Sequence, residues 1–510
     1  MTAFPSCPGF TACGGCKYND LAYDRQLDEK QKRLEKLLGS FCAVSPIRGM
    51  DEPLHYRCKV HQVLTRDPQG RIAGGYYAAG SHKVVTVPSC RLDDRDSQAV
   101  IGTVCRLAKE FGLPVYNEIK KTGFFRHVMV RKSRSTGEMM AILVAASPEM
   151  HGKNKFVQAL TAAHPQVTSV ILNVNDRRTS IVLGEKNITL YGPGYLTETL
   201  CGLEFRLSPA SFFQVNPVMA EAFYETAMDL AGLTGTETLI DAYCGTGTIG
   251  LIAAGRAGKI IGSELNADAV RDARQNARAN KIKNAEFVRA DAGRFMTERA
   301  AKGESADVVF LDPPRSGCSP AFLDALLRLA PGRIVYISCG PESLARDLAV
   351  LTKNAYRVQA IRPFDLFPFT EHCECAVLLC RNNSSHSMDL QNEPFEMIKN
   401  GQKTIELRLY DEKRKKVKAG DVIVFTNVET NETLNVSVLK LHRFDSFETL
   451  YRSLPLLKCG YTEDNVSKAA PSDMEQYYSA AEQKHCGAVG IEISLLKETT
   501  DQCVTLMTTE

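Results

Sequence analysis

Cys339 is the residue of this sequence whose type and position point most clearly to chemistry. It follows the run Val335–Ser338, which is apolar and typical of a strand. Cysteine is often a buried and inert residue, so the thiol alone indicates little. At the carboxyl end of a strand, beside a cofactor cleft, a thiol is placed to act as a nucleophile. The elements around Cys339 therefore decide how it is interpreted.

A glycine-rich turn upstream predicts the cofactor cleft. A strand-like run ends at Asp241, Gly245 and Gly247 follow, and a helix is expected from about Ile249. Glycines allow the sharp turn and the close approach of a ligand. Glu264, which follows a second predicted strand at 259–263, is placed to accept both hydroxyls of a ribose. The third glycine of the dinucleotide pattern is missing, so S-adenosylmethionine is favoured over a nicotinamide cofactor.

The remaining strands of this region predict how the candidate residues meet. Strand-like runs at 285–289, 306–311, 333–338 and 375–380 alternate with helical stretches. This alternation predicts a doubly wound parallel sheet, which binds ligands at the carboxyl ends of its strands. Five candidate residues fall at those ends: Tyr243, Glu264, Asp291, Asp312 and Cys339.

Four cysteines nearer the N-terminus form a second group. Cys7, Cys13 and Cys16 are closely spaced, and Cys90 follows at a distance. Together they supply the four thiolates that a [4Fe–4S] cluster needs. A zinc ion is one alternative, although its cysteine ligands usually come as two close pairs, and unliganded thiols are the other. We expect a cytoplasmic protein without a signal peptide, in which disulfides are rare.

The charge distribution indicates a nucleic-acid partner. The net charge is only +3, yet residues 1–135 carry 22 Lys and Arg against 13 Asp and Glu, a net of +9. Such a basic part suits a phosphate backbone. Within it, the segment 120–134 interleaves cations with Phe124 and Phe125 and predicts a hairpin, whose rings either stack on RNA bases or pack inward. No apolar run approaches the length needed to cross a membrane, and we expect a monomer.

Five motifs occur in the order of one known family: Ser211–Asn216, Asp241–Gly247, Leu311–Gly317, Ile337–Pro341 and Phe367–Glu374. Through them, residues 1–382 resemble the RNA 5-methyluridine methyltransferases, and most closely the iron–sulfur enzymes that methylate 23S ribosomal RNA. The resemblance implies an α/β fold with a class I, Rossmann-like methyltransferase domain at 206–382. An iron–sulfur and α+β RNA-binding region at 1–205 would precede it.

The resemblance also assigns roles to individual residues. The thiolate of Cys339 would add to C6 of a flipped-out uracil, C5 would then take the methyl group, and Glu374 would remove the C5 proton. S-adenosylmethionine would be bound by Gln214, Tyr243, Glu264 and Asp312, with Asp291 a weaker addition. The [4Fe–4S] cluster would be held by Cys7, Cys13, Cys16 and Cys90.

Some positions depart from the family pattern. Phe369 stands where the family usually carries His, and Glu371 stands where a small residue is common. Glu371 is therefore a second candidate for the base, although Glu374 matches the family position. Arg315 follows the Asp-Pro-Pro turn where amino-methyltransferases need an aromatic residue, so an exocyclic amine is disfavoured as the methyl acceptor. We interpret the other nearby cysteines as packing residues: Cys244, Cys318, Cys373 and Cys375.

A further globular part is expected after a polar linker at 381–387. Residues 388–497 resemble the ASCH domain, a small β-barrel with a proposed RNA-binding cleft, which Lys403, Glu406 and Arg408 would line. The alternation at 404–409 and the apolar run at 422–425 fit a barrel independently. Some relatives hydrolyse acetylated cytidine with a Thr where Glu406 stands, so nucleic-acid binding is favoured over hydrolysis and over a purely structural addition.

The sequence thus predicts an S-adenosylmethionine-dependent enzyme that methylates C5 of a uridine in 23S ribosomal RNA. The first alternative is a tRNA uridine-C5 methyltransferase with the same chemistry, whose relatives lack the cluster cysteines. The second is a non-catalytic RNA-binding protein that keeps the fold. The intact thiol, carboxylate and cofactor turn argue against that second alternative.

Overall fold

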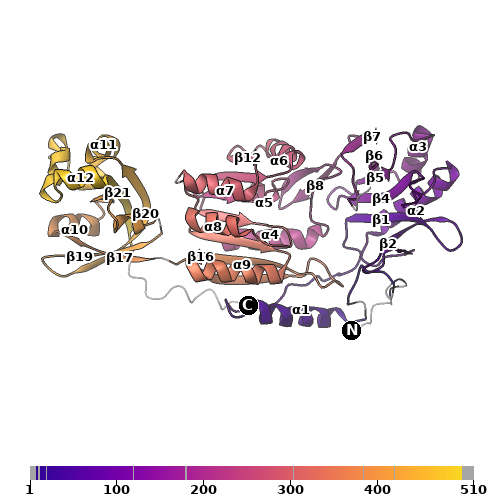
Figure 1. Ribbon diagram of the computed structural model, residues 1–510, viewed down its shortest axis with the longest axis horizontal. Coiled ribbons are helices and arrows are strands. Elements are labelled where there is room, and N and C mark those ends of the chain that lie inside the picture. The colour runs from indigo at the N-terminus through magenta and orange to yellow at the C-terminus, as the bar shows by residue number, and fades with distance from the viewer. Residues whose placement is uncertain are drawn as a thin grey trace. The chain divides into compact units, whose positions relative to one another are not determined.

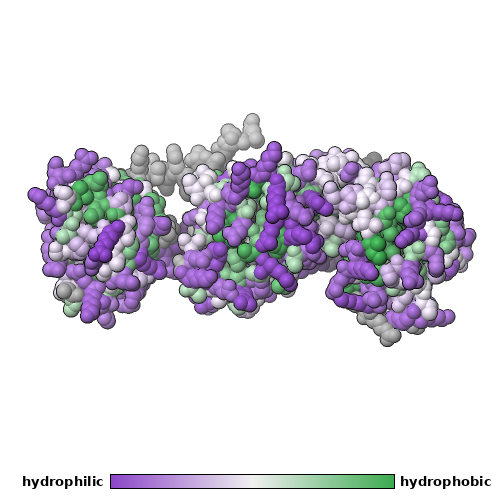
Figure 2. All heavy atoms as spheres, turned by 90° about the horizontal axis from the view of Figure 1, so that it is seen from above, coloured by the Kyte–Doolittle hydropathy of each residue, from purple (hydrophilic) through white to green (hydrophobic). Residues whose placement is uncertain are grey.

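The computed structural model describes residues 7, 9, 12–18, 20–118, 120–177, 181–302, 304–382, 384–418 and 420–496. The chain divides into two compact units between Cys380 and Arg381, and each buries cores of its own. On the face seen in Figure 2, hydrophilic side chains predominate and hydrophobic ones form smaller patches among them. Within the described residues, no helix has both the length and the apolar character that crossing a membrane requires.

A seven-stranded sheet forms the first layer of the first unit (Figure 1). Its strand order is β3 (Val84–Thr86), β2 (Ile72–Tyr77), β1 (Lys59–Arg66), β4 (Phe125–Lys132), β5 (Met139–Ala145), β6 (Val167–Val174) and β7 (Lys186–Tyr191). Helices α2 (Arg95–Glu110) and α3 (Lys153–Ala163) pack on alternate residues of β4 and β5. Burial of this apolar face is the main force that holds the layer together.

The hairpin predicted at 120–134 is displaced in the structure. β4 begins at Phe125 and pairs with β5 across a turn at 133–138, so the hairpin lies at 125–145. Phe124 and Phe125 are 7% and 0% exposed, and the ring of Phe125 lies 6.0 Å from that of Phe156 on α3. The rings therefore pack inward, which is the second of the two alternatives that the sequence left open.

A second seven-stranded sheet in the same unit carries the predicted cofactor site. Its order is β12 (Ala285–Arg289), β11 (Lys259–Glu264), β10 (Thr238–Asp241), β13 (Val308–Leu311), β14 (Arg333–Ser338), β16 (Glu374–Arg381) and β15 (Tyr356–Phe364). Alternate residues of β13 face two different cores: Val308 and Phe310 belong to one, Val309 and Leu311 to the other. Both faces of this sheet are therefore buried.

Helices cover both faces of this sheet (Figure 1). The core on one face contains α4 (Pro217–Ala231), α5 (Thr248–Ala253) and α6 (Ala267–Ala279), and the core on the other contains α7 (Ala292–Ala301), α8 (Pro320–Leu329) and α9 (Pro341–Asn354). The predicted doubly wound α/β fold is confirmed. A short hairpin of β8 (Leu196–Leu200) and β9 (Leu203–Leu207) precedes α4.

The sheet departs from the prediction at one edge. Strands β10 to β14 are parallel, but β16 runs antiparallel to β14, and the sequence analysis did not identify β15. Because β15 occupies the edge, the chain returns through the loop at 365–373 and enters the gap beside β14 in the opposite direction. This reversal carries the last sequence motif to the end of β14.

The N-terminal helix α1 (Tyr23–Leu38) packs with the second sheet although it is distant from it in sequence. Leu34 and Leu38 are fully buried in the core that contains α9. Lys30 forms an ion pair with Asp365 in which both side chains are fully buried, with Nζ 2.7 Å from Oδ1. Lys30 also donates to the backbone oxygens of Phe367 and His372. Through Lys30, helix α1 thus holds the loop that precedes β16 in place.

The second unit is built on a five-stranded sheet. Its order is β17 (Ser385–Leu390), β19 (Val422–Asn427), β20 (Thr433–Phe444), β21 (Ala488–Leu495) and β18 (Ile405–Leu409), with helices α10 (Asn392–Lys399), α11 (Phe447–Ser453) and α12 (Ala480–Cys486). Short 3-10 helices lie between these elements: η1 (Arg414–Lys416), η2 (Leu456–Cys459), η3 (Val466–Lys468) and η4 (Pro471–Gln476). Part of the predicted linker, residues 385–387, is already strand, because it pairs with β19.

Candidate active site

The ends of β14 and β16 bring Cys339 and Glu374 together. Cys339 is the residue after β14, and Glu374 is the first residue of β16. Ser338 pairs with Cys375 in the antiparallel ladder, so the next positions along the two strands are Cys339 and Glu374. Glu374 is 3% exposed, and Cys339 is half-buried. A thiol and a buried carboxylate therefore stand side by side at the edge where ligands are expected.

The surroundings control the ionisation of both groups. Burial raises the pKa of the Cys339 thiol to about 11; Glu374 and Asp312 add to the rise, and Arg315 opposes it. Burial also raises the pKa of Glu374 well above its usual range, with Asp312 adding to the rise and Arg315 again opposing it. Arg315 thus lowers the pKa of both groups, an influence that the sequence analysis did not foresee. Its position directly after the Asp-Pro-Pro turn, at the carboxyl end of β13, could have indicated that it lies near the candidate site.

A small cavity beside the glycine turn collects three of the residues predicted to bind the cofactor. Gln214, Tyr243 and Asp312 line it together with Gly245. Gly245 has a φ of +52°, and a Cβ built on it would meet no atom within 4 Å, so the backbone there is open to a ligand. Tyr224, which the sequence analysis did not single out, also lines the cavity and is hydrogen-bonded to Gln214.

Two carboxylates, those of buried Asp241 and half-buried Asp312, lie in this region. Burial raises the pKa of Asp241 and that of Asp312 to about 7 each, so both groups ionise less readily than in water. A positively charged ligand would therefore be stabilised here. The sulfonium and ammonium groups of S-adenosylmethionine carry such charge, so these residues fit the predicted cofactor.

The two other predicted cofactor residues lie in different settings. Glu264 ends β11, and its carboxylate accepts hydrogen bonds from the backbone N–H groups of Gly245 (3.2 Å) and Asn266 (2.7 Å). This holds the carboxylate against the glycine turn. Asp291 is exposed and caps α7 by accepting from the backbone N–H of Arg294 (3.0 Å). Asp291 thus stabilises the start of α7, and this interaction explains its position without a cofactor.

The second candidate base is engaged elsewhere. Glu371 is exposed, and its Oε2 lies 2.7 Å from Nζ of Lys17. This ion pair and the ladder register favour Glu374 as the group that acts beside Cys339. The neighbouring cysteines are buried as packing residues: Cys244 5%, Cys318 3%, and Cys373 and Cys375 0% exposed.

The four N-terminal cysteines meet in the folded chain. Cys7, Cys13, Cys16 and Cys90 line one small cavity in the first unit. In the described part of the chain, no three of these four sulfurs all lie within 4.8 Å of one another. Sulfurs around one tetrahedral zinc ion would be about 3.8 Å apart, given a Zn–S distance of about 2.3 Å.

The cysteine segment is bound directly to the loop that leads to Glu374. The backbone N–H groups of Lys17 and Tyr18 donate to the carbonyl oxygen of Phe369, at 2.8 and 3.2 Å. Phe369, where the family usually carries His, is 1% exposed and packs with Tyr56 and Leu92 in a small core that also contacts Cys16 and Cys90.

A basic cavity opens between this segment and the active-site loops. It has a volume of about 560 Å³, and Lys17, Arg57, Lys59 and Arg315 line it. Of the acidic residues, Glu371 alone lines it in the described part of the chain, so the lining is positive overall. Such a surface suits the phosphates that flank a target nucleotide.

The fold and this site define a class I methyltransferase, which takes its methyl group from S-adenosylmethionine. The sequence model of the tRNA (Uracil-5-)-methyltransferase family matches residues 22–382, and that of the ASCH domain matches residues 388–497. The chain therefore belongs to the RNA uracil-5-methyltransferase family and carries a C-terminal ASCH domain.

Relatives of known sequence and structure agree with this assignment. An uncharacterized RNA methyltransferase of Halalkalibacterium halodurans is 40% identical over 378 residues, which are 73% of this chain and 82% of the relative. Another, from Caldanaerobacter subterraneus, is 39% identical over 381 residues, 74% of this chain and 84% of the relative. The structure of Pyrococcus abyssi tRNA (uracil-54, C5)-methyltransferase in complex with S-adenosyl-L-homocysteine has 27% identity and a TM-score of 0.61, over 72% of this chain and 86% of that one.

Proposed function

We propose that this enzyme methylates C5 of a uridine in 23S ribosomal RNA through a covalent bond between Cys339 and C6 of the base. The observation that carries the proposal is the pairing of a half-buried thiol with a buried carboxylate at the ends of β14 and β16. Uracil C5 becomes nucleophilic only after a nucleophile has added to C6, and the C5 proton must be removed afterwards. One thiol and one carboxylate are the groups that this chemistry requires.

The steps follow from what each side chain can do. The Cys339 thiolate forms a bond to C6, and the electron pair of the C5–C6 double bond moves into an enolate with carbanion character at C5. S-adenosylmethionine, when bound, supplies the methyl group that C5 takes. Glu374 then accepts the C5 proton, the C5–C6 double bond re-forms, and the bond between C6 and sulfur breaks. Arg315 stabilises the ionised forms of both protein groups.

The proposal extends to a [4Fe–4S] cluster held by Cys7, Cys13, Cys16 and Cys90. The shared cavity supports it, because four thiolates at one place are the ligands that such a cluster binds. The cluster would cross-link the N-terminal segment that holds the loop at 365–373 in place. By the resemblance described under Sequence analysis, the same cysteines favour ribosomal RNA as the substrate.

The second candidate substrate is a tRNA. The solved structure from Pyrococcus abyssi is that of a tRNA (uracil-54, C5)-methyltransferase, and it matches 72% of this chain. The chemistry at Cys339 and Glu374 would be the same, and only the surfaces that select the RNA would differ.

A covalent trap tests the mechanism and the substrate together. The purified protein is incubated with radiolabelled S-adenosylmethionine and with 23S RNA or tRNA in which 5-fluorouridine replaces uridine, and denaturing gels are then examined for a labelled adduct. Fluorine cannot leave as a proton does, so the adduct persists. Cys339→Ala should abolish it, whereas Cys42→Ala, at another half-buried cysteine, should not.

Each outcome has a distinct meaning. An adduct with 23S RNA alone supports both the covalent mechanism and the substrate. An adduct with tRNA alone keeps the mechanism and overturns the substrate. No adduct with either RNA, from protein that still binds S-adenosylmethionine, overturns the covalent mechanism.

A further inference from the structure

One carboxylate in the basic cavity has no role in the methyl transfer. Glu371 lines the cavity, but the ladder register favours Glu374 as the base. Among the four cations of the lining, Lys17 is the one for which the described part of the chain supplies an ion-pair partner. That partner is Glu371, whose Oε2 lies 2.7 Å from Nζ of Lys17. One positive charge of the cavity is therefore neutralised by the protein's own carboxylate.

The two side chains of this ion pair are open to solvent. That of Lys17 is 60% exposed and that of Glu371 is 47% exposed. Such pairs contribute little stability, because water and salt compete with each partner. A phosphate is an anion whose oxygens accept hydrogen bonds from an ammonium group, as those of a carboxylate do. A phosphate that enters the cavity can therefore replace Glu371 at Lys17 at little cost.

The backbone on both sides of the pair is held by other bonds. The N–H of Lys17 donates to the carbonyl oxygen of Phe369 at 2.8 Å. Nη1 of Arg33 donates to the backbone oxygen of Glu371 at 3.0 Å. The two side chains can therefore separate while the cysteine segment and the loop at 365–373 stay joined.

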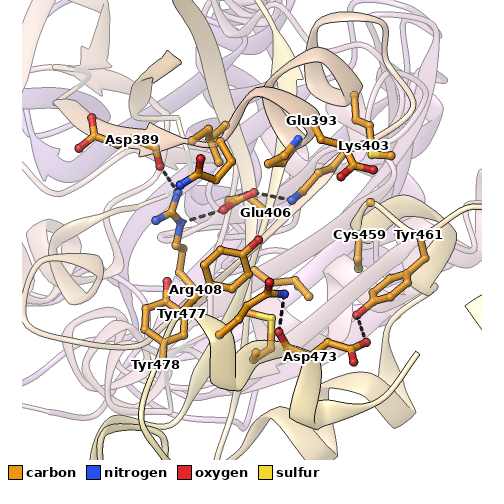
Figure 3. A pocket seen from close by; sticks show the side chains of 18 of the residues that line it. Asp389, Glu393, Lys403, Glu406, Arg408, Cys459, Tyr461, Asp473, Tyr477 and Tyr478 are labelled. Carbon is orange, nitrogen blue, oxygen red and sulfur yellow. Dashed lines mark hydrogen bonds and ion pairs between the residues drawn. The ribbon is translucent and has the colours of Figure 1, made fainter. Parts of the chain in front are cut away.

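A buried lysine–glutamate pair in the second unit shows the contrast (Figure 3). Lys403, Glu406 and Arg408, which were expected to line a common cleft, line one cavity of about 500 Å³. The side chains of Lys403 and Glu406 are only 10% and 4% exposed, and Glu406 also pairs with Arg408. Separating such a pair leaves a buried charge without compensation. Exchange for a phosphate is thus favoured at Lys17 and not at Lys403.

We propose that Lys17 binds a phosphate of the RNA substrate and that Glu371 is the counterion that Lys17 exchanges for it. The inference rests on the proposed function, in that the substrate is an RNA whose backbone enters the basic cavity. Phosphate contacts carry no sequence information, so the exchange weakens the binding of every RNA by a similar factor. Glu371 thus keeps the cavity from holding unrelated RNA tightly, and contacts with the bases select the substrate.

Binding of RNA to the full chain tests the exchange. A fragment of 23S RNA, a tRNA and a single-stranded RNA of unrelated sequence are titrated with saturating S-adenosylhomocysteine, which prevents methyl transfer. Glu371→Gln should tighten the binding of all three about two- to fivefold, because an exposed ion pair no longer opposes it. Glu342→Gln is the matched control. Glu342 is 60% exposed and pairs with Arg33 in the same unit, but it is not among the described residues that line the basic cavity.

Lys17→Met tests the other partner of the exchange. RNA binding should weaken, and the slope of log K against log salt concentration should fall in magnitude by about 0.7–0.9, because one phosphate fewer is neutralised. In the Lys17→Met background, Glu371→Gln should no longer tighten binding. Lys32→Met, at an exposed lysine of α1 whose partner is Glu29, should change neither the affinity nor the slope.

Each outcome decides between the exchange and another role. Tighter binding in Glu371→Gln that depends on Lys17 supports the exchange. The inference is overturned if Glu371→Gln leaves RNA binding unchanged or weakens it, as a pair that only fastens the loop would. It is also overturned if binding tightens equally with and without Lys17, as simple repulsion would cause, or if Glu342→Gln has the same effect. The 5-fluorouridine adduct at Cys339 is a separate measurement, so each proposal can fail without the other.

Discussion

Arg315→Met should make the Cys339 thiol harder to ionise. Arg315 lies on the wall of the basic cavity, with Nη2 3.2 Å from Nε2 of His372, and its side chain is exposed, so the change should not disturb the core. The guanidinium lowers the pKa of Cys339 against burial and against the carboxylates of Glu374 and Asp312. Removing it leaves burial and the two carboxylates, which raise the pKa, opposed by a backbone hydrogen bond at Cys339.

The size of the effect follows from the pKa of about 11 at Cys339. At pH 8 about one thiol in a thousand is then ionised. Loss of one nearby, partly screened charge costs on the order of 1 kcal/mol, which is close to one pKa unit. The thiolate population at pH 8 would fall about tenfold, but a more basic thiolate is also a better nucleophile, with a Brønsted coefficient of about 0.4–0.5. We expect alkylation at pH 8 to slow about threefold and the apparent pKa to rise by about one unit.

The assay is alkylation by iodoacetamide across a range of pH, with the peptide that contains Cys339 quantified by mass spectrometry. Iodoacetamide is uncharged, so the change does not alter its attraction to the site. Arg328→Met is the matched control, because Arg328 is an exposed arginine of α8 whose partner is Asp324. Melting temperatures of both variants verify the fold. An apparent pKa at Cys339 that stays unchanged or falls in Arg315→Met would refute the electrostatic reasoning.

Three further changes test other parts of the structure. Glu374→Gln should let methylated RNA accumulate as a covalent complex on denaturing gels, because no base removes the C5 proton; normal turnover would contradict this assignment. Gly247→Ala should weaken S-adenosylmethionine binding and lower the free energy of unfolding by about 1–3 kcal/mol. The reason is that the residue has a φ of +83° and that its Cβ would lie 2.9 Å from Phe287 Cζ. An unchanged urea denaturation curve would contradict the predicted loss of stability. Lys30→Met should lower the free energy of unfolding by about 3–5 kcal/mol, because it leaves a buried carboxylate without its ion-pair partner. Lys32→Met, at an exposed pair, should lower it by less than about 1 kcal/mol. Equal losses of stability in the two variants would be evidence against the buried pair.

The sequence predicted those parts of the fold that local signals specify. The runs at 285–289 and 333–338 are strands with those same bounds, and the glycine turn stands between β10 and α5 as expected. Buried parallel strands are continuous apolar runs, and glycines at positive φ mark sharp turns, so both can be recognised within a few residues. The family motifs rest on such local runs as well.

Other features depend on which distant segments pair. Strand β15 alternates buried and exposed residues at the sheet edge, and its presence reverses β16. Only that reversal sets Glu374 beside Cys339. Likewise, the sequence did not decide whether Phe124 and Phe125 contact RNA or pack inward. In the structure both rings are buried in the core that contains α2 and α3.

The sequence by itself determined the chemical groups, namely one thiol, several carboxylates, four grouped cysteines and a glycine turn. The tertiary structure alone decided which of them act on one another. Arg315 influences Cys339 and Glu374, and Lys17 is bound to the loop at 365–373, because elements that are not adjacent in sequence are packed together. Electrostatic and hydrogen-bond energies depend on distance and burial, and folding sets both.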